Sequence, residues 1–255
     1  MKSQPSVAIV IPMYQSVIQK DEKKSLTAWK KYLSQYNTYI VCPDDVVSPI
    51  KQAKVVHFEK KYFASVQSYS ELLLTSFFYE HFKKYDYILI YQLDAVVYSN
   101  DLLFWMKKKY DYIGAPWWSS FIGFLSSPLG KRKLVGNGGL SLRKVSSMID
   151  VLNRVKKVAR TSSLSRKDIL IHFLFSVFIG KSRGKWLPTS AEQYPFNEDG
   201  FWSFEAQKYL KTFKVPSFSE AHLFAVETHP DLSMKYLQGK KPFGCHAWKK
   251  YHASF

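Results

Sequence analysis

The feature that most constrains the fold is the alternation of short apolar segments with segments of helical spacing in the first half of the chain. Three segments are apolar and rich in β-branched residues, as buried parallel strands are: Val7–Pro12, Thr38–Cys42 and Tyr87–Tyr91. The spacing of apolar residues predicts helices over Leu26–Tyr36, Tyr69–Phe82 and Leu102–Lys109. Strands that alternate with helices require crossover connections, which produce a mostly parallel sheet covered on both faces. The sequence therefore predicts an α/β chain with a Rossmann-type sheet, and no linker divides residues 1–255 into two domains.

The net charge is the unusual number in the composition. The chain has 255 residues, 46% of them hydrophobic, which is enough to support a folded core. Its formal net charge of +17 favours a phosphate-bearing substrate, a nucleic acid or an anionic membrane surface. Two cysteines, Cys42 and Cys245, cannot form a disulfide framework, so a reducing cytosolic setting is expected.

More than half of this charge lies in one basic and apolar segment, at about 145–185. Between Arg143 and Lys185 there are eleven Lys/Arg and two acids, a net +9. Helical spacing over Val145–Val158 places six apolar residues on one side: Val145, Met148, Ile149, Leu152, Val155 and Val158. One interpretation is an amphipathic helix packed on the core. The other is a surface segment that docks on anionic lipid, with Phe173, Phe175 and Phe178 entering the interface. The apolar run Ile169–Gly180 is too short to span a bilayer, which needs about 20 residues.

Polar residues follow the predicted strands at Tyr14, Asp44–Asp45 and Asp94. In an open α/β sheet, ligands bind at the carboxyl ends of the strands. Asp94 comes directly after an apolar strand, where Mg²⁺ or Mn²⁺ is a natural partner because such ions take carboxylate and phosphate oxygens together. The alternative is an aspartate that caps the next turn.

Three further segments carry side chains suited to chemistry or to ligand contact. The first is the glycine loop Gly136–Gly139, which contains Asn137. Its glycines would allow a ligand to approach the main chain closely; alternatively, the loop is a turn before a strand. Glu198 and Asp199 precede aromatic residues, and an apolar wall of this kind can raise the pKa of one carboxylate so that it acts as a general base. The other interpretation, which is compatible with the first, is a helix that Asn197 caps and whose positive N-terminal end the two acids stabilise. His246 is either a metal ligand near Asp94 or a packed, hydrogen-bonded residue.

Taken in order, these segments resemble a glycosyltransferase of the GT-A fold. The closest resemblance is to a bacterial family catalogued as a domain of unknown function, through the motifs VAIVIPMY, SYSELL, YDYILIYQLDAVV, YIGAPW, VGNGGLSLR, NED-x-FW and PFGCHAW. The resemblance covers nearly the whole chain except about Val151 to Ser190. It implies one GT-A-like catalytic domain.

The resemblance also implies roles for individual residues. The Asp-x-Asp metal motif falls on Gln92-Leu93-Asp94, so that Asp94 and His246 would hold Mn²⁺ or Mg²⁺. Gln92 replaces the first acid, which puts the metal affinity of the motif in question. The nucleotide-sugar site would include Pro12, Tyr14, Ser68, Tyr69, Gln92, Asp94, Gly138 and Gly139. The acceptor site would include Trp117, Trp118 and Asn137. The acid pair Glu198 and Asp199 would supply the base, with Asp199 preferred.

The implied reaction is transfer of a sugar from a nucleotide donor, with UDP the commonest nucleotide of GT-A enzymes, to a glycan or lipid-linked acceptor. A single displacement would invert the configuration at the anomeric carbon. The expected setting is bacterial surface polysaccharide synthesis in the cytoplasm. If the basic segment contacts lipid, the protein would lie at the inner face of the membrane. Nucleic acid is not an expected partner. Three alternatives stay open: a basic nucleic-acid-binding protein, a metal-dependent nucleotidyltransferase on a similar sheet, and a GT-A-shaped protein that has lost activity.

Overall fold

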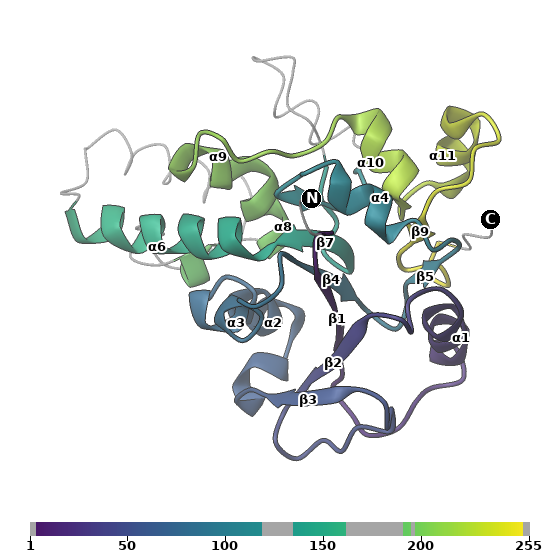
Figure 1. Ribbon diagram of the computed structural model, residues 1–255, viewed down its shortest axis with the longest axis horizontal. Helices are drawn as coiled ribbons and strands as arrows, with labels where there is room; N and C mark the ends of the chain where they lie inside the picture. Colours follow the sequence, from purple (N-terminus) through teal and green to yellow (C-terminus); the bar gives the residue numbers. More distant parts are fainter. Residues whose placement is uncertain (1–3, 119–134, 162–190, 195–196, 252–255) are drawn as a thin grey trace, which may run out of the picture.

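The centre of the molecule is a six-stranded sheet with the strand order β3-β2-β1-β4-β7-β6 (Figure 1). A computed structural model describes residues 4–118, 135–161, 191–194 and 197–251. The strands of this sheet are β1 (Val7–Pro12), β2 (Asn37–Cys42), β3 (Lys54–His57), β4 (Tyr87–Tyr91), β6 (Tyr112–Ile113) and β7 (Leu140–Lys144). The first four are parallel, while β7 runs antiparallel to β4 and β6 antiparallel to β7. The prediction of a mostly parallel sheet, with its three strands, is confirmed.

Helices cover both faces of this sheet (Figure 1). The α-helices of the described residues are α1 (Glu22–Tyr32), α2 (Val66–Leu72), α3 (Ser76–Glu80), α4 (Leu102–Lys107), α6 (Val145–Thr161), α8 (Glu198–Gly200), α9 (Ala206–Tyr209), α10 (Phe218–Phe224) and α11 (Pro230–Leu237). Shorter turns are the 3₁₀ helices η1 (Lys60–Phe63) and η3 (Ala191–Gln193) and the π-helix η4 (Phe201–Glu205).

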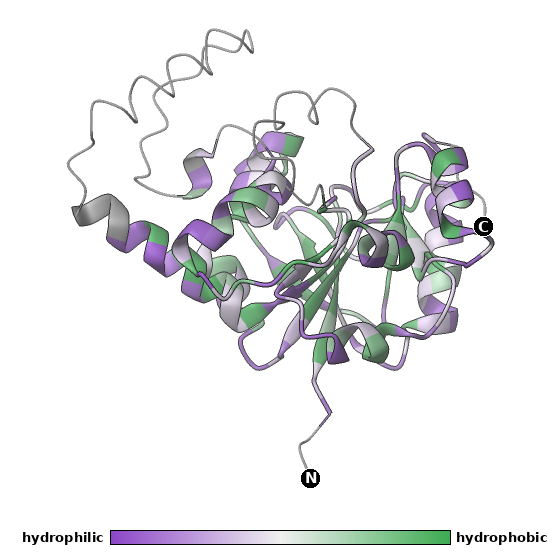
Figure 2. Cartoon of the chain, turned by 90° about the horizontal axis from the view of Figure 1, so that it is seen from above, coloured by the Kyte–Doolittle hydropathy of each residue, from purple (hydrophilic) through white to green (hydrophobic). Residues whose placement is uncertain are grey.

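The two-residue period of β1 separates two hydrophobic cores. Ile9 and Ile11 pack in one core with residues of α1, α4 and α10. Ala8 and Val10 pack in the other with residues of α2, α3, α6 and η4. Apolar residues accordingly concentrate on the central strands, and polar residues on the outer sides of the helices (Figure 2).

A second, small sheet brings the end of the chain to the carboxyl end of β4. It has the order β5-β9-β8 and consists of β5 (Val96–Val97), β8 (Ala225–Val226) and β9 (Gly244–Cys245). Val96 pairs with Cys245, so His246 comes to lie beside the turn that contains Asp94. This pairing joins segments about 150 residues apart in the sequence.

Two predicted helices differ from the observed ones. The segment Tyr69–Phe82 is not one helix but two, α2 and α3, because the Thr75 side chain accepts a hydrogen bond from Phe78 N and caps a new helix. Helix α1 begins at Glu22 and ends at Tyr32 rather than covering Leu26–Tyr36. The chain needs the residues after Tyr32 for the turn into β2, which begins at Asn37.

The helix predicted at Val145–Val158 is α6, and its apolar side packs on the core. Val145, Met148, Leu152 and Val155 are buried, as the interpretation of an amphipathic helix requires. The phenylalanines of the lipid-docking hypothesis, Phe173, Phe175 and Phe178, lie outside the described residues. Within the described part of the chain, no helix combines the length and apolar character needed to cross a membrane.

Candidate active site

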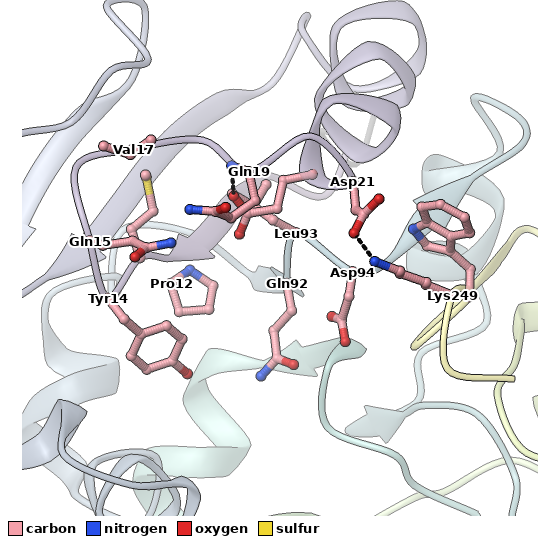
Figure 3. A pocket seen from close by; sticks show the side chains of 13 residues that line it. Pro12, Tyr14, Gln15, Val17, Gln19, Asp21, Gln92, Leu93, Asp94 and Lys249 are labelled. Atoms are coloured by element: carbon pink, nitrogen blue, oxygen red, sulfur yellow. Dashed lines mark hydrogen bonds and ion pairs between the residues drawn. The ribbon is translucent and has the colours of Figure 1, made fainter.

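A cavity of about 390 Å³ opens at the carboxyl ends of β1 and β4 (Figure 3). Four of the residues predicted to bind the donor line it: Pro12, Tyr14, Gln92 and Asp94. The other lining residues come mainly from the β1–α1 loop and from the turn after β9: Met13, Gln15, Val17, Gln19, Asp21, Glu22, Leu93, Trp248 and Lys249. The cavity thus occupies the place where open α/β sheets bind their ligands.

Tyr14 forms one wall of this cavity. Its side chain is half exposed, and its ring packs edge-on against Phe63 and Tyr69, with centroid distances of 5.9 and 6.0 Å. Tyr69 is buried behind it and does not line the cavity. Ser68 does not line it either, because its hydroxyl completes the capping box of α2 with Ser65. The Tyr14 ring is therefore an aromatic surface on which a planar ligand could stack, and Trp248 is the other aromatic side chain that the described residues place on the cavity wall.

The charged side chains that the described residues place on the cavity wall are mostly acidic. They are the carboxylates of Asp21, Glu22 and Asp94 and the ammonium of Lys249. Lys249 pairs with Asp21 at the mouth of the cavity (Figure 3). A locally acidic cavity in a protein of net charge +17 does not favour a bare diphosphate, but it suits a cation.

Asp94 and His246, the two predicted metal ligands, lie in contact. His246 Nε2 is 3.1 Å from Asp94 Oδ1 and 3.1 Å from Gln92 Oε1. On the other side of the ring, His246 Nδ1 is 3.2 Å from Glu227 Oε1. Asp94 is half exposed to the cavity, with a side chain 53% accessible, whereas His246 and Glu227 are buried. The imidazole therefore joins a buried carboxylate to an accessible one.

These contacts shift the pKa values of the pair in opposite directions. Burial alone would lower the pKa of His246, but the hydrogen bonds to Asp94 and Glu227 outweigh it and raise that pKa to about 9. Burial would raise the pKa of Asp94, but its hydrogen bond to His246 lowers it. Both groups are therefore charged at neutral pH, and a cation at Nε2 would have to displace the imidazolium proton.

The glycine loop Gly136–Gly139 lies against this pair. A Cβ atom at Gly139 would come 2.0 Å from His246 Nε2, and one at Gly138 would come 2.5 Å from Glu198 Oε1. The Asn137 side chain accepts a hydrogen bond from Gly139 N at 3.0 Å and holds the turn closed. Two adjacent glycines thus separate the Asp94–His246 pair from the predicted acid pair.

We expect Gly139→Ala to destabilise the protein by about 1–3 kcal/mol, because its methyl group would overlap the buried His246 ring. Urea unfolding followed by circular dichroism measures the change. Gly200→Ala is the matched control: Gly200 has helical dihedral angles, and its nearest neighbour, Tyr194 Oη, would lie 3.3 Å from the new Cβ. Equal stabilities of the two variants would show that the close approach at Gly139 is not tight.

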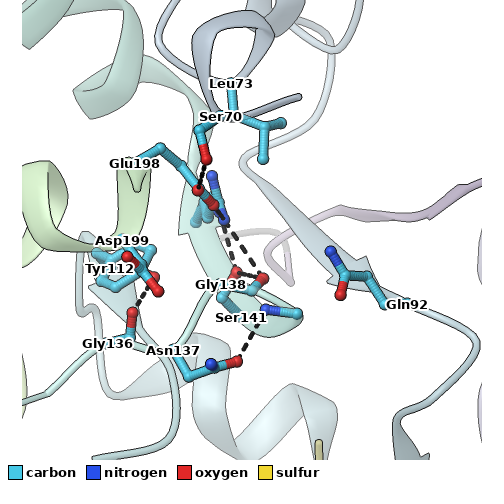
Figure 4. Close-up of polar contacts among 12 residues, drawn as sticks. Ser70, Leu73, Gln92, Tyr112, Gly136, Asn137, Gly138, Ser141, Glu198 and Asp199 are labelled. Carbon is cyan, nitrogen blue, oxygen red and sulfur yellow. Dashed lines mark hydrogen bonds and ion pairs between the residues drawn. The ribbon is translucent and has the colours of Figure 1, made fainter. Parts of the chain in front are cut away.

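Glu198 of the acid pair is buried in an ion pair (Figure 4). Its Oε1 accepts a hydrogen bond from Arg143 Nη2 at 2.8 Å, and its Oε2 accepts one from Ser70 Oγ at 3.0 Å. Arg143 is fully buried and also donates to Tyr79 Oη, at 3.1 Å. Because both carboxylate oxygens are occupied, Glu198 holds α8 against β7 and α2.

Asp199 has a different environment, although it is the next residue. Its Oδ1 accepts a hydrogen bond from Gly200 N at 2.7 Å, and no described side chain of opposite charge pairs with it. Burial, with the negative charge of Glu198 as the second cause, raises its pKa to about 8. A carboxylate with a pKa near the working pH is suited to accept a proton from a substrate.

The two tryptophans predicted to bind the acceptor are placed apart from the cavity. The Trp117 ring lies 5.9 Å from that of Phe204. Trp118 packs against α10 and α11, where its Nε1 donates to Ser233 Oγ at 2.7 Å. Neither tryptophan lines the cavity.

Two residues central to the site were not identified in the sequence. Arg143 belongs to the motif VGNGGLSLR, but strand alternation shows only that it faces a core, and an arginine there gives no sign of its partner. Glu227 follows β8, which has two residues and so no periodic pattern to detect. Asp21, Glu22 and Lys249 reach the cavity from loops, which hydrophobic periodicity does not locate either.

Comparisons with known proteins agree with this fold. The family model described as "Protein of unknown function (DUF5672)" matches residues 52–246. The structure is similar to that of xyloside xylosyltransferase 1 from mouse, in its apo form, with 12% sequence identity, a TM-score of 0.53, and coverage of 96% of this chain and 99% of that chain. A glycosyltransferase involved in the glycosylation of the major capsid of PBCV-1 is also similar, with 11% identity, a TM-score of 0.46, and coverage of 95% and 93%. No curated protein matches the sequence.

The family model covers about three quarters of the chain, and the likeness to the mouse enzyme extends over nearly all of it. At this level of identity the structural likeness concerns the fold, and it confirms the expected mostly parallel sheet flanked by helices. The chain therefore belongs to the family of proteins of unknown function DUF5672, and its fold is that of the GT-A glycosyltransferases.

Proposed function

We propose that this protein is a glycosyltransferase that moves a sugar from a nucleotide donor to a hydroxyl group of a glycan or lipid-linked acceptor. One observation carries the proposal: the Asp94–His246 pair and the acid pair Glu198–Asp199 lie on two sides of adjacent glycines in a GT-A fold. Asp94 of the first pair lines a cavity at the strand ends, and the second pair contains Asp199, a carboxylate whose pKa is about 8. A transferase needs these two functions, one for the leaving diphosphate and one for the attacking hydroxyl.

A divalent cation, Mn²⁺ or Mg²⁺, fits the residues at the cavity. Asp94 Oδ1, His246 Nε2 and Gln92 Oε1 are suitable donors and lie together. Among the described residues, no three His, Cys, Asp or Glu side chains form a group that could hold a metal ion, so oxygens of the donor diphosphate and water would complete the coordination. The acidic cavity wall supports this, because a diphosphate entering it alone would be repelled. When bound, the cation would neutralise charge on the leaving diphosphate.

The acid pair would divide the remaining work. Asp199, once deprotonated, accepts the proton of the acceptor hydroxyl, whose oxygen forms a bond to the anomeric carbon of the donor. The bond between that carbon and the diphosphate oxygen breaks on the opposite face, so one displacement inverts the configuration. Glu198 touches neither reactant in this scheme; its ion pair with Arg143 keeps α8, and with it Asp199, in place.

The finer parts of the proposal concern the substrates and the cellular setting. We propose a UDP-sugar donor whose base lies over Tyr14, and a role in bacterial surface polysaccharide synthesis at the cytoplasmic side of the membrane. The basic segment at about 145–185 would contact anionic lipid through residues beyond α6. The site also fits sugar transfer better than nucleotidyl transfer. A nucleotidyltransferase usually needs two or three carboxylates that bind metal, whereas Asp94 is the single carboxylate that contacts His246 Nε2 among the described residues.

A screen for donor binding tests the proposal. UDP-, GDP-, CMP- and dTDP-sugars are added with and without Mn²⁺, and the melting temperature is recorded. A donor at about 100 times its Kd stabilises the folded state by about 2.7 kcal/mol. For a chain of this size the melting temperature should rise by about 5–10 °C. In Asp94→Asn the part of the shift that depends on Mn²⁺ should disappear. Failure of every nucleotide sugar to raise the melting temperature would argue strongly against a transferase.

A further inference from the structure

Glu227 is a buried carboxylate to which the mechanism above assigns no role. It directly follows β8, and its residue is 8% exposed. β8 and β9 are parallel, with Val226 opposite Cys245, so Glu227 and His246 occupy the next position on the two strands. A backbone hydrogen bond from His246 N to Val226 O, at 2.9 Å, continues this alignment beyond the strands. The main chain therefore presents the Glu227 carboxylate to one side of the His246 ring.

The chemistry of the contact determines which nitrogen of His246 faces Asp94 and Gln92, two residues that line the cavity. In the 3.2 Å contact with Glu227 Oε1, a carboxylate oxygen accepts and the Nδ1–H of the imidazole donates. Nε2 is then the nitrogen that remains for Asp94 and Gln92, both 3.1 Å away. A histidine that binds a metal commonly donates its second N–H to a carboxylate, which fixes its tautomer and ring orientation.

The ring has partners on both of its nitrogens. Asp94 on the Nε2 side is half exposed, whereas Glu227 on the Nδ1 side is buried, and Gly139 lies against the ring without a side chain. An imidazole rotated by half a turn would present carbon instead of Nε2 to Asp94. It would lose the contacts of Nε2 with Asp94 and Gln92 as well as that of Nδ1 with Glu227, but of these three partners Glu227 is the one on the side of the ring away from the cation.

We infer that Glu227 is a positioning residue that holds the His246 imidazole with Nε2 toward Asp94, so that this nitrogen can bind the divalent cation of the donor complex. The inference rests on the proposed function, since it assumes a cation at Asp94. It goes beyond that proposal by naming a residue that contacts neither the cation nor a substrate.

Glu227→Gln tests the inference because it keeps the size of the side chain and changes the hydrogen bonding. The glutamine carbonyl accepts from Nδ1–H more weakly than a carboxylate does, and the NH₂ can instead donate to Nδ1, which favours the tautomer with a proton on Nε2, where the cation would bind. We expect the Kd for Mn²⁺, measured by the loss of the free-ion signal in electron paramagnetic resonance, to rise about 10- to 100-fold. Glu220→Gln is the matched control, because Glu220 caps α10 and is not part of the site; its Kd should equal that of the unaltered protein.

Further measurements separate a positioning role from a structural one. With a donor identified by the thermal screen, the Mn²⁺ concentration that gives half-maximal transfer should rise by the same factor in Glu227→Gln, while kcat at saturating Mn²⁺ stays unchanged. The melting temperature in EDTA shows whether each variant is folded. If Glu227→Gln does not fold, Glu227→Asp replaces it, since the shorter carboxylate no longer reaches Nδ1 at 3.2 Å and should also weaken Mn²⁺ binding.

The outcomes distinguish the inference from the proposed function. If Asp94→Asn abolishes Mn²⁺ binding but Glu227→Gln binds Mn²⁺ as the unaltered protein does, the positioning role is wrong and the transferase proposal is unaffected. If nucleotide sugars bind and are turned over without any divalent cation, the positioning role also fails, and the cation in the proposed function fails with it.

Discussion

Replacing Asp199 with asparagine should lower the rate of sugar transfer by about 10²- to 10⁴-fold, the usual contribution of a general base. The amide has nearly the shape of the carboxylate but cannot accept the proton of the acceptor hydroxyl. Donor binding should stay intact, because Asp199 does not line the cavity that carries Asp94. Initial rates measured with a donor from the thermal screen, together with the melting-temperature shift that this donor causes, report the two properties separately.

The pH dependence of the unaltered enzyme should agree with this role. Burial and the charge of Glu198 raise the pKa of Asp199 to about 8, and only the deprotonated form is a base. At saturating Mn²⁺, where displacement of the His246 proton no longer limits the rate, kcat/KM should therefore rise about tenfold per pH unit below 8 and level off above it. Asp150→Asn is the control for the substitution itself, because Asp150 is partly exposed on α6, where it pairs with Arg154. Near-normal transfer by Asp199→Asn, with donor binding preserved, would mean that another group is the base.

Replacing Arg143 with methionine should destabilise the fold by about 3–5 kcal/mol, the largest loss of stability that we expect from a single substitution. Arg143 is fully buried, and its partner Glu198 is 6% exposed. Without the guanidinium, the Glu198 carboxylate would be left with Ser70 as its hydrogen-bond partner and no opposite charge. Urea unfolding at neutral pH, where the carboxylate is ionised in the unfolded chain, measures the loss.

Two further variants show whether the loss comes from the uncompensated charge. Arg154→Met breaks an exposed i,i+4 pair with Asp150 and should cost at most about 0.5 kcal/mol. The double variant Arg143→Met/Glu198→Gln removes both charges and should regain part of the stability lost in the single variant. A loss below about 1 kcal/mol in Arg143→Met would be incompatible with a buried ion pair of this kind.

The main elements of the fold could be predicted because their signals are local. The runs Val7–Pro12 and Tyr87–Tyr91 are long enough for β-branched and aromatic residues to identify buried strands. The apolar side of α6 repeats with a helical period, and its described residues pack as that period predicts. The break between α2 and α3 could not be predicted in this way, because apolar residues continue across it and the decisive signal is one capping threonine.

The candidate site was predicted only in part, for a related reason. Asp94 was identified because it follows a strand, and Gln92 through the resemblance to the Asp-x-Asp motif; their place at the cavity agrees with the rule for ligands of α/β sheets. Sequence position could not reveal that Glu198 has an arginine partner while Asp199 has none among the described residues, although the two residues are neighbours. That difference separates a structural carboxylate from a candidate base.

The sequence by itself thus determined the mostly parallel α/β sheet and the resemblance that identified the segments carrying chemistry, because periodicity and short motifs are properties of neighbouring residues. The tertiary structure alone decided which side chains meet. Strand β9 pairs with both β5 and β8. These pairings bring together Glu227, which follows β8, His246, which follows β9, and Asp94, which lies in the turn after β4. Strands of two residues have no recognisable period, and contacts over such separations depend on how the whole chain packs. For this reason the sequence could suggest Asp94 and His246 as ligands, whereas the carboxylate that orients His246 was found only in the folded molecule.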